Sequence, residues 1–152
     1  MIAPPASLPS NRHRFRVYYG DTDMAGIVYY ANYLRWFEAG RCELMHSVGL
    51  RYLVLQGAGR TLPVVSAAVN YHHPARYEDE LELETRVVEI KHVSLRIQYR
   101  LVRVADGKLV ATGETGHACV DDRGRPVRMP PTFRAALSGE AADVPLQDSG
   151  QP

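Results

Sequence analysis

The stretch YYGDTDMAGIVYYANYLRWFEAGR, residues 18–41, joins a short acidic loop to the first turns of a long helix. Glycine, aspartate and threonine over residues 20–26 favour a loop, because glycine has wide backbone freedom and the other two form local hydrogen bonds. From residue 30 to residue 48 apolar side chains recur at every third or fourth position, which is the period of a helix with one buried side. Gly49 stands just past that range, where a helix end often needs a left-handed residue. We therefore predict a helix over residues 30–48.

Alternating apolar and polar residues predict strands before and after this helix. One short strand over residues 13–19 precedes it, with Phe15, Val17 and Tyr19 on one face. Four longer strands are expected at residues 62–73, 79–90, 93–104 and 109–120. An antiparallel sheet of this length must curl, and the predicted helix is the element available to fill its concave side. We therefore predict an α+β fold in which a curved antiparallel sheet of about five strands wraps one long helix, with a bare sheet edge that favours pairing with a second copy.

Length, charge and cysteine content narrow the class of protein. The 152 residues fit one domain, and the formal net charge of +1 argues against a general nucleic-acid binder. No apolar run approaches the ~20 residues of a membrane span, and the first residues lack the basic and apolar order of a signal peptide. Cys42 and Cys119 lie far apart outside any CxxC motif, so we expect a reduced, cytoplasmic protein. Residues 1–11 and 138–152 are expected to be flexible, which leaves a working domain over residues 12–137.

The two acids of the loop, Asp21 and Asp23, admit two interpretations. As ordinary loop residues they would face solvent or cap the following helix. Alternatively, one of them is a catalytic carboxylate, because the start of a helix offers unpaired backbone N–H groups that can hold a developing oxyanion. Gly26 fits this second interpretation, since it lets another group approach the backbone closely. A carboxylate beside such donors is half of a site for acyl transfer.

Together with the helix, the loop forms a longer pattern, D-x-D-x-x-G-x-V-aromatic followed by a tyrosine and E-x-x-R. The residues that carry it are Asp21, Asp23, Gly26, Val28, Tyr29, Tyr33, Glu38 and Arg41. This pattern resembles the signature of the 4-hydroxybenzoyl-CoA thioesterase family, the acyl-CoA thioesterases with the hotdog fold. The resemblance extends over about residues 12–135 and includes the later stretches VNYHHPARYEDELELETRVVEI and GRPVRMP. It implies the hotdog fold, which is also the arrangement that the helix and strand pattern predicts.

The resemblance implies a role for the matching residues of the loop. Asp23 would be the catalytic carboxylate, Asp21 would tie the loop, and the backbone N–H of Tyr30 would hold the thioester oxygen. Residues expected to border the substrate are Gly26, Ile27, Val28, Tyr29 and Tyr33. A thioester carbonyl is already activated, so we expect no metal and no other cofactor. Whether Asp23 attacks the carbonyl or activates water stays open, and an aromatic-lined pocket suits an aliphatic or an aromatic acyl group.

The phosphates of CoA require cations, and the resemblance places them at the turn over residues 90–94. Lys91 and His92 are the candidates in this turn, and Arg76 and Arg128, which lie elsewhere in the sequence, are weaker candidates. Each of them could equally be an ordinary surface charge.

Two further features have plainer explanations than a functional one. Glu38 stands three residues before Arg41, which favours an ion pair along the helix. His72 and His73 are adjacent in a predicted strand, so their side chains face opposite sides and cannot easily chelate one metal ion.

These observations predict a thioesterase that hydrolyses an acyl-CoA, or an acyl-carrier-protein thioester, as a homodimer or homotetramer, without a nucleic-acid partner or a membrane span. The alternative is a hotdog protein that binds such thioesters without hydrolysing them. Asp23 favours the enzyme, because a pure binder needs no carboxylate beside an oxyanion site. A hydratase is a third class, but such enzymes use a histidine-based site, and residues 18–41 contain no histidine.

Overall fold

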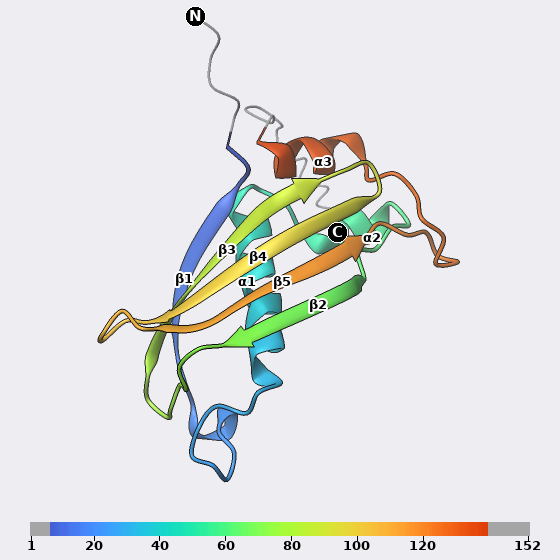
Figure 1. Ribbon diagram of the computed structural model, residues 1–152. Coiled ribbons are helices and arrows are strands. Elements are labelled where there is room, and N and C mark those ends of the chain that lie inside the picture. The colour runs from blue at the N-terminus through green and yellow to red at the C-terminus, as the bar shows by residue number, and fades with distance from the viewer. Residues whose placement is uncertain (1–6, 140–152) are drawn as a thin grey trace, which may run out of the picture.

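The computed structural model describes residues 7–139. Figure 1 shows one antiparallel sheet curved around a long helix, with two shorter helices at one end. The strands are β1 (Ser10–Arg16), β2 (Val64–Tyr71), β3 (Glu80–Ile90), β4 (Ser94–Arg103) and β5 (Leu109–Ala118). The helices are α1 (Asn32–Ser47), α2 (Tyr52–Gly57) and α3 (Pro131–Ser138), with a short 3-10 turn, η1 (Tyr19–Asp21), before α1. The predicted five-stranded α+β fold is confirmed.

The sheet has the strand order β1-β3-β4-β5-β2, and every neighbouring pair is antiparallel. Along β3 and β4 buried residues alternate with exposed or half-buried ones, as the sequence pattern predicts. In their register Leu83 faces Leu101 and Thr85 faces Tyr99. These side chains form the inner face of the sheet because strand residues two apart point to the same side.

Helix α1 fills the concave face. Phe37 is fully buried and its ring stacks on that of Tyr99, with ring centroids 4.2 Å apart. Gly40 lets the helix approach β3 closely, since a Cβ there would collide with the side chains of Thr85 and Leu83. The prediction of a helix over residues 30–48 agrees with the observed bounds to within two residues at each end.

The structure corrects the sequence-based expectations in three places. The first strand ends at Arg16, so Tyr19 lies in η1 with a 76% exposed side chain and does not share the buried face of Val17. Helices α2 and α3 were not expected. Strand β1 begins at Ser10, inside the segment expected to be flexible. Most of the two end segments, residues 1–11 and 138–152, lies outside the described residues.

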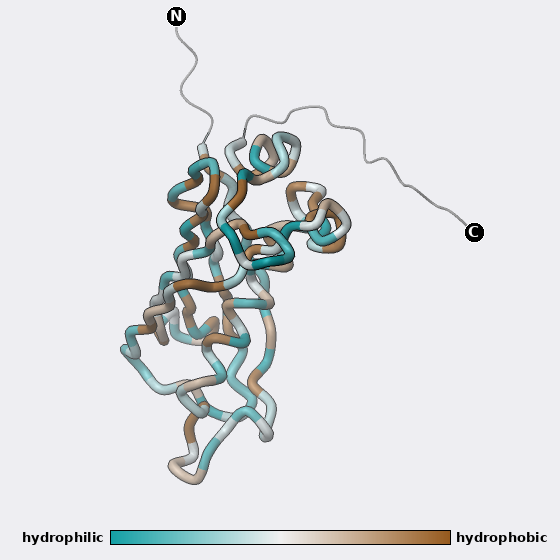
Figure 2. The backbone as a smooth tube through the Cα atoms, turned by 90° about the vertical axis from the view of Figure 1, so that its right-hand side faces the viewer, coloured by the Kyte–Doolittle hydropathy of each residue, from teal (hydrophilic) through white to brown (hydrophobic). Residues whose placement is uncertain are grey.

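The molecule has two ends that differ in structure. The loop end contains residues 18–31, which follow β1 and lead into α1. The α3 end contains α2, α3 and the β3–β4 turn at residues 91–93, and Figures 1 and 2 show the two short helices together there. Helix α1 runs from the loop end toward the α3 end, about 14 Å from Asn32 to Arg41 at the usual 1.5 Å rise per residue.

The two edge strands differ in charge. Arg12 and Arg14 of β1 form ion pairs with Glu84 and Glu82 of β3, and exposed charges protect an edge from pairing with another chain. Strand β2, VVSAAVNY, contains no charged residue and seven of its eight residues are exposed. None of the described helices has the length and hydrophobicity needed to cross a membrane.

Candidate active site

The acidic loop at the loop end is a tight, doubled-back segment. Asp23 N–H donates to the carbonyl of Ile27, Thr22 bridges Val28, and Tyr29 N–H donates to the carbonyl of Asp21. At its tip Gly26 has a φ of 76°, a left-handed backbone that glycine adopts without strain. The loop therefore holds its backbone in one conformation next to the start of α1.

Asp21 ties this loop to its surroundings. Its Oδ2 accepts a hydrogen bond of 2.8 Å from Tyr18 N–H, and its carbonyl accepts one of 2.8 Å from the Asn32 side chain, the first residue of α1. These contacts match the structural role expected for this residue.

The side chain of Asp23 is exposed. Its Oδ1 accepts a 2.8 Å hydrogen bond from Ala25 N–H, and its Oδ2 accepts none from the described residues. One carboxylate oxygen is thus fixed by the loop while the other is free to act on a ligand.

The backbone N–H of Tyr30 donates to no acceptor within residues 7–139. It lies one residue after Tyr29, whose N–H closes the loop, and its carbonyl accepts a 2.8 Å hydrogen bond from the Tyr71 hydroxyl at the end of β2. A free N–H whose peptide is held in this way is a fixed donor for an oxyanion.

Tyrosines surround the start of α1. The rings of Tyr29 and Tyr30 lie 4.8 Å apart, and those of Tyr33 and Tyr71 lie 5.1 Å apart. The Tyr30 hydroxyl, with smaller contributions from burial and from the Asp23 carboxylate, raises the pKa of Tyr29. Tyrosine rings and hydroxyl groups therefore gather beside the acidic loop at the start of α1.

Of the residues expected to border the substrate, three are accessible and two are not. Gly26 and Tyr29 are exposed and Ile27 is half-buried, whereas Val28 and Tyr33 are 2% and 3% exposed and belong to the core. Within a single chain Val28 and Tyr33 support the loop from beneath and are closed to a ligand.

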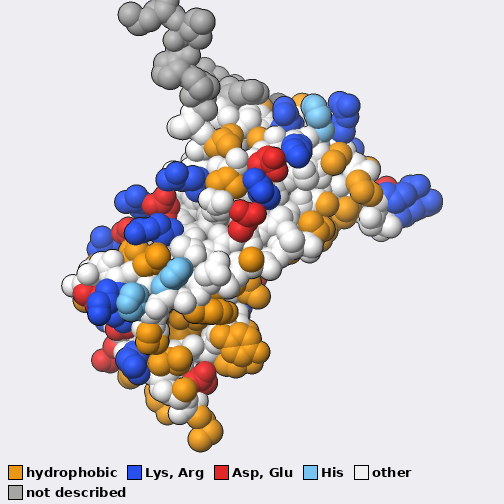
Figure 3. All heavy atoms as spheres, in the orientation of Figure 1, with side chains coloured by type: hydrophobic (Ala, Val, Ile, Leu, Met, Phe, Trp, Pro, Cys, Tyr) orange, Lys and Arg blue, Asp and Glu red, His pale blue; other side chains and the backbone are white. Residues whose placement is uncertain are grey.

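The four candidates for CoA binding separate into two groups. Arg76 lies at the loop end, where its Nη1 donates a 3.4 Å hydrogen bond to the Gly26 carbonyl. The other three gather at the α3 end, where His92 and Arg128 line a hollow of about 520 Å³ and Lys91 stands in the adjoining turn. Figure 3 shows blue Lys and Arg side chains and one pale-blue His side chain at the α3 end, near the top of the view, with further charged side chains spread along the left side of the molecule.

The hollow at the α3 end contains two cations that the sequence-based interpretation missed, Arg60 and Arg134. No carboxylate lines it, and the Arg134 Nε atom is buried without a hydrogen-bond partner in the described part of the chain. A possible signal for α3 was the run PPTFRAAL, with prolines before the first turn and Phe133 and Leu137 four residues apart. Reading it as a helix would have pointed to Arg134.

A second hollow, of about 490 Å³, lies between α1 and the start of β2. We call it the α1 hollow, and it is lined by Glu38, Arg41, Cys42, Met45, His46, Tyr52, Leu62, Pro63, Val64, Leu95, Ile97 and His117. Most of its wall is apolar, but Arg41 and His117 bring polar atoms to it. The expected ion pair between Glu38 and Arg41 is wrong, because Arg41 turns toward the sheet, where its Nη1 donates a 3.1 Å hydrogen bond to the Tyr99 hydroxyl.

A chain of buried hydrogen bonds continues from Tyr99. The Tyr99 hydroxyl lies 2.6 Å from Thr115 Oγ1, which lies 2.9 Å from His117 Nε2, and His117 Nδ1 lies 3.1 Å from the Leu62 carbonyl. Because Arg41 can only donate, every bond is satisfied when Tyr99 donates to Thr115, Thr115 donates to Nε2 and Nδ1–H donates to Leu62. This direction requires a neutral His117, and burial lowers the pKa of His117.

We expect His117 to make stability depend on pH. The unfolded chain, with an imidazole pKa near 6.5, binds the proton more readily than the native state, so the contribution of His117 is present above that pKa and lost as the pH falls through it. Replacing His117 with Gln keeps an acceptor and a donor but removes the titration. Urea unfolding at about pH 7.5 and about pH 5 should show a smaller loss of the free energy of unfolding in His117→Gln than in the unmodified chain.

Burial also lowers the pKa of His13, which is present both in His117→Gln and in the unmodified chain. The contribution of His13 to the pH dependence is therefore the same in both chains and cancels in the comparison. Equal losses of the free energy of unfolding in the two chains would exclude His117 as a titrating group.

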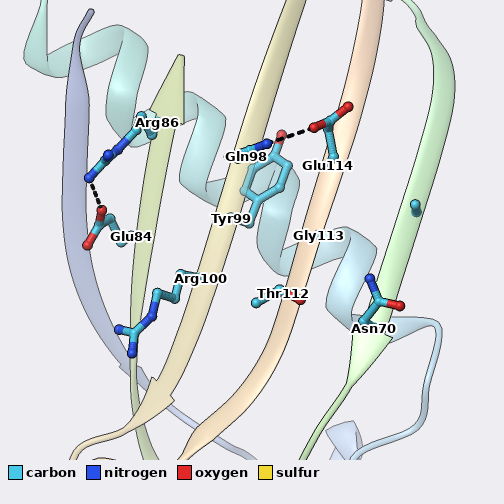
Figure 4. A pocket seen from close by; sticks show the side chains of 10 residues that line it. Asn70, Glu84, Arg86, Gln98, Tyr99, Arg100, Thr112, Gly113 and Glu114 are labelled. Carbon is cyan, nitrogen blue, oxygen red and sulfur yellow. Dashed lines mark hydrogen bonds and ion pairs between the residues drawn. The ribbon is translucent and has the colours of Figure 1, made fainter. Parts of the chain in front are cut away.

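A third hollow, of about 480 Å³, lies on the outer face of the sheet, away from α1. Figure 4 shows its polar lining, in which Glu84 contacts Arg86 along β3 and Gln98 of β4 contacts Glu114 of the neighbouring strand β5. Against the effect of partial burial, hydrogen bonds from Arg86 and Arg12 lower the pKa of Glu84. This face is a network of paired charges with no part of the acidic loop in its lining.

A family model described as the thioesterase-like superfamily matches residues 17–137, which include the acidic loop, α1 and strands β2 to β5. The chain belongs to the thioesterase-like superfamily. This finding confirms the family assignment made from the loop and helix pattern.

Individual members of the superfamily support the same conclusion. An acyl-CoA thioester hydrolase, YbgC, of Escherichia coli O6:H1 is 34% identical over 116 residues, which cover 76% of this chain and 83% of the relative. The DHNA-CoA thioesterase of Staphylococcus aureus superimposes with a TM-score of 0.81 at 26% identity, covering 85% of this chain and 89% of that one. A mutant 4-hydroxybenzoyl CoA thioesterase complexed with 4-hydroxybenzoyl CoA has a TM-score of 0.77 at 25% identity, covering 85% and 99%. The hotdog fold is therefore confirmed.

Proposed function

We propose that this protein is an acyl-CoA thioesterase in which Asp23 acts as base or nucleophile and the backbone N–H of Tyr30 holds the thioester oxygen. With Asp23 as base, its carboxylate takes a proton from water while the hydroxide adds to the carbonyl carbon. The oxygen becomes negative and accepts a hydrogen bond from the free N–H. The C–S bond then breaks, and the proton passes to the thiolate, leaving a carboxylic acid and free CoA.

The observation that carries this proposal is the pairing of a half-free carboxylate with an unpaired backbone N–H on one rigid loop. Asp23 Oδ1 is held by Ala25 N–H, and Oδ2 and the Tyr30 N–H have no partner in the part of the chain that the structure describes. A simple binding protein gains nothing from a carboxylate in this position, because it would repel the electron-rich thioester oxygen. The naming of relatives as acyl-CoA thioester hydrolases agrees with hydrolysis.

Our proposal includes a homodimer through β2, which would serve the same function. The β2 edge is uncharged and exposed, and two antiparallel copies of it would place the Val64 end of one chain beside the Tyr71 end of the other. Because Tyr71 binds Tyr30 and Val64 lines the α1 hollow, the loop end of one protomer would lie beside the α1 hollow and the α3 end of its partner. The thioester would then react at Asp23 while the partner holds both the acyl group and the CoA phosphates.

We expect replacement of Lys91 with Ala to weaken CoA recognition more than catalysis. Lys91 stands in the turn beside the hollow at the α3 end, and its ion pair with Glu89 is long, at 3.5 Å. Its loss should raise KM for a CoA ester severalfold while leaving KM for the matching pantetheine thioester, which lacks the nucleotide phosphates, within about twofold. Steady-state kinetics with both thioesters measures the difference.

Lys108, which lies in the distant β4–β5 turn, is the matched control, and Lys108→Ala should leave both KM values unchanged. Equal changes for the two thioesters in Lys91→Ala would remove Lys91 from the CoA site.

The function itself is tested by a hydrolysis screen of the purified protein against aliphatic and aromatic acyl-CoA esters, with release of free thiol as the readout. A carrier-protein thioester of the best acyl group belongs in the same screen, because the carrier protein remains a candidate partner. Binding of acyl-CoA without thiol release would favour the non-catalytic alternative. The free thiols of Cys42 and Cys119 agree with our prediction of a cytoplasmic enzyme.

A further inference from the structure

The α1 hollow contains a cation, Arg41, that forms no ion pair within residues 7–139, although Glu38 lines the same hollow. Arg41 is half-buried, and its guanidinium forms no ion pair with any carboxylate in residues 7–139. Its one hydrogen bond goes to the neutral Tyr99 hydroxyl, although a guanidinium has five N–H donors. Partial burial of an unpaired charge is unfavourable, and such a group is retained most readily where a ligand completes it.

The structure also fixes this cation in place. Tyr99, Thr115 and His117 are 3%, 2% and 4% exposed, and their hydrogen-bonded chain runs from the Arg41 guanidinium to the Leu62 carbonyl. Three polar side chains on the inner face of a sheet replace apolar residues that would otherwise fill the core. Their shared effect is to hold the Tyr99 oxygen where it accepts from Arg41 and so to orient the remaining guanidinium donors.

The rest of the hollow is suited to the body of an acyl group. Met45, Leu62, Leu95 and Ile97 provide apolar walls, and a volume of about 490 Å³ is in the usual range for a small-molecule pocket. An acyl group that enters this hollow meets apolar walls along its length and a positive charge at the wall formed by Arg41.

We propose that Arg41 selects acyl groups that carry a hydrogen-bond-accepting oxygen at the end far from the thioester. This inference rests on the proposed function, because the acyl group bound in the hollow is hydrolysed at Asp23 of the partner protomer. A hydroxyl and a carboxylate both accept from Arg41, whereas a methyl group leaves the guanidinium unpaired. Glu38 also lines the hollow and disfavours a carboxylate more than a hydroxyl, so the two oxygen groups form separate arms of the test.

The test compares matched esters in one enzyme. The aromatic set consists of the CoA esters of benzoic acids with a methyl, a hydroxyl or a carboxyl group opposite the thioester, and the aliphatic set consists of hexanoyl, hydroxyhexanoyl and adipoyl esters. For at least one oxygen-bearing ester, kcat/KM should exceed that of its methyl-ended match by about tenfold or more. In Arg41→Met this ratio should fall to within about twofold of one. The ratio is internal to each preparation, so it does not depend on the fraction of folded enzyme.

Arg35→Met is the matched control, since Arg35 is an exposed residue of the same helix whose side chain has no hydrogen bond or ion pair with other described residues, and it should keep the ratio of the unmodified protein. Thr115→Val interrupts the row of hydrogen bonds that orients Arg41 and should also lower the ratio. It provides a second variant for the test if Arg41→Met does not fold. A role of Arg41 or Thr115 in stability alone would change the amount of active enzyme and leave the ratio intact.

Heterodimers of an Asp23→Asn chain and an Arg41→Met chain, purified through two different tags, test the arrangement across the interface. If the acyl group binds in the partner's hollow, the one active site contains Asp23 and Arg41 from different chains, both intact, and shows the ratio of the unmodified protein. The ratio of Arg41→Met would instead show that both residues act within one chain and would overturn the inference.

Two further outcomes separate this inference from the proposed function. Hydrolysis of all esters with ratios near one overturns the selection by Arg41 and leaves the thioesterase in place. Hydrolysis of none of them overturns the proposed function, and this inference with it.

Discussion

Replacement of Asp23 with Asn should lower kcat for the best acyl-CoA at least about a hundredfold, the low end of what a positioned acid or base contributes. The Asn side chain still offers an oxygen to Ala25 N–H, so the loop keeps its hydrogen bond and its shape. The substitution removes the negative charge of the carboxylate, whose Oδ2 accepts no hydrogen bond from the described residues. The loss should therefore fall on the chemical step, with KM changed little, and steady-state thiol release measures both parameters.

Asp21→Ala separates chemistry from loop stability. Asp21 Oδ2 accepts from Tyr18 N–H, and its loss costs about 1 kcal/mol of stability, a typical value for a cap of this kind. We expect a lower midpoint of thermal unfolding in Asp21→Ala and an unchanged one in Asp23→Asn. Activity should be lost in Asp23→Asn and largely kept in Asp21→Ala. An Asp23→Asn enzyme with full activity would show that another group performs the hydrolysis.

The elements with a regular spacing of apolar residues could be predicted from the sequence. Leu81 and Leu83 alternate with acidic residues along β3, and such alternation predicts which face of the strand is buried. The three-and-four spacing of α1 is equally direct. Tyr19 was misplaced because the alternation continues past Arg16 while the backbone turns into η1, and alternation carries no signal for where a strand stops.

The candidate site was predictable only where its residues are neighbours in the sequence. Asp23, Gly26 and Tyr30 lie in one loop, so one motif contains them. Arg41 was expected to pair with Glu38 because helix spacing allows it, yet the packing of α1 turns the guanidinium toward Tyr99. Spacing along a helix says which side chains can meet, and the sheet beneath decides which do.

The same limit applies to the hollow at the α3 end. Arg60 and Arg134 reach it from α2's C-terminal loop and from α3, two segments that lack long periodic patterns. Arg60 and Arg134 meet His92 only because the tertiary fold brings three distant segments together at the α3 end, and no local sequence pattern predicts that packing.

Replacement of Ala67 with Lys should prevent the proposed β2 dimer, leave monomers and remove most of the activity. Ala67 is exposed near the middle of β2, so in two antiparallel copies of this edge the two lysines would stand close to each other across the two-fold axis. Like charges facing each other across strands are destabilising, and a lysine on an edge strand is a common device against pairing. The mass from light scattering and the rate of thiol release should fall together.

Ser10→Lys places the same charge at the start of β1, the other edge of the sheet, and should leave mass and activity unchanged. The fold of Ala67→Lys should survive, since an exposed side chain on β2 adds no buried charge, and near-native thermal unfolding would verify this. A folded, monomeric Ala67→Lys that retains full activity would contradict a site shared between protomers. A folded monomer without activity is the expected result, because Asp23 would then stand at one end of α1 and the α1 hollow of its own chain near the other, with Arg41 about 14 Å along the helix from Asn32.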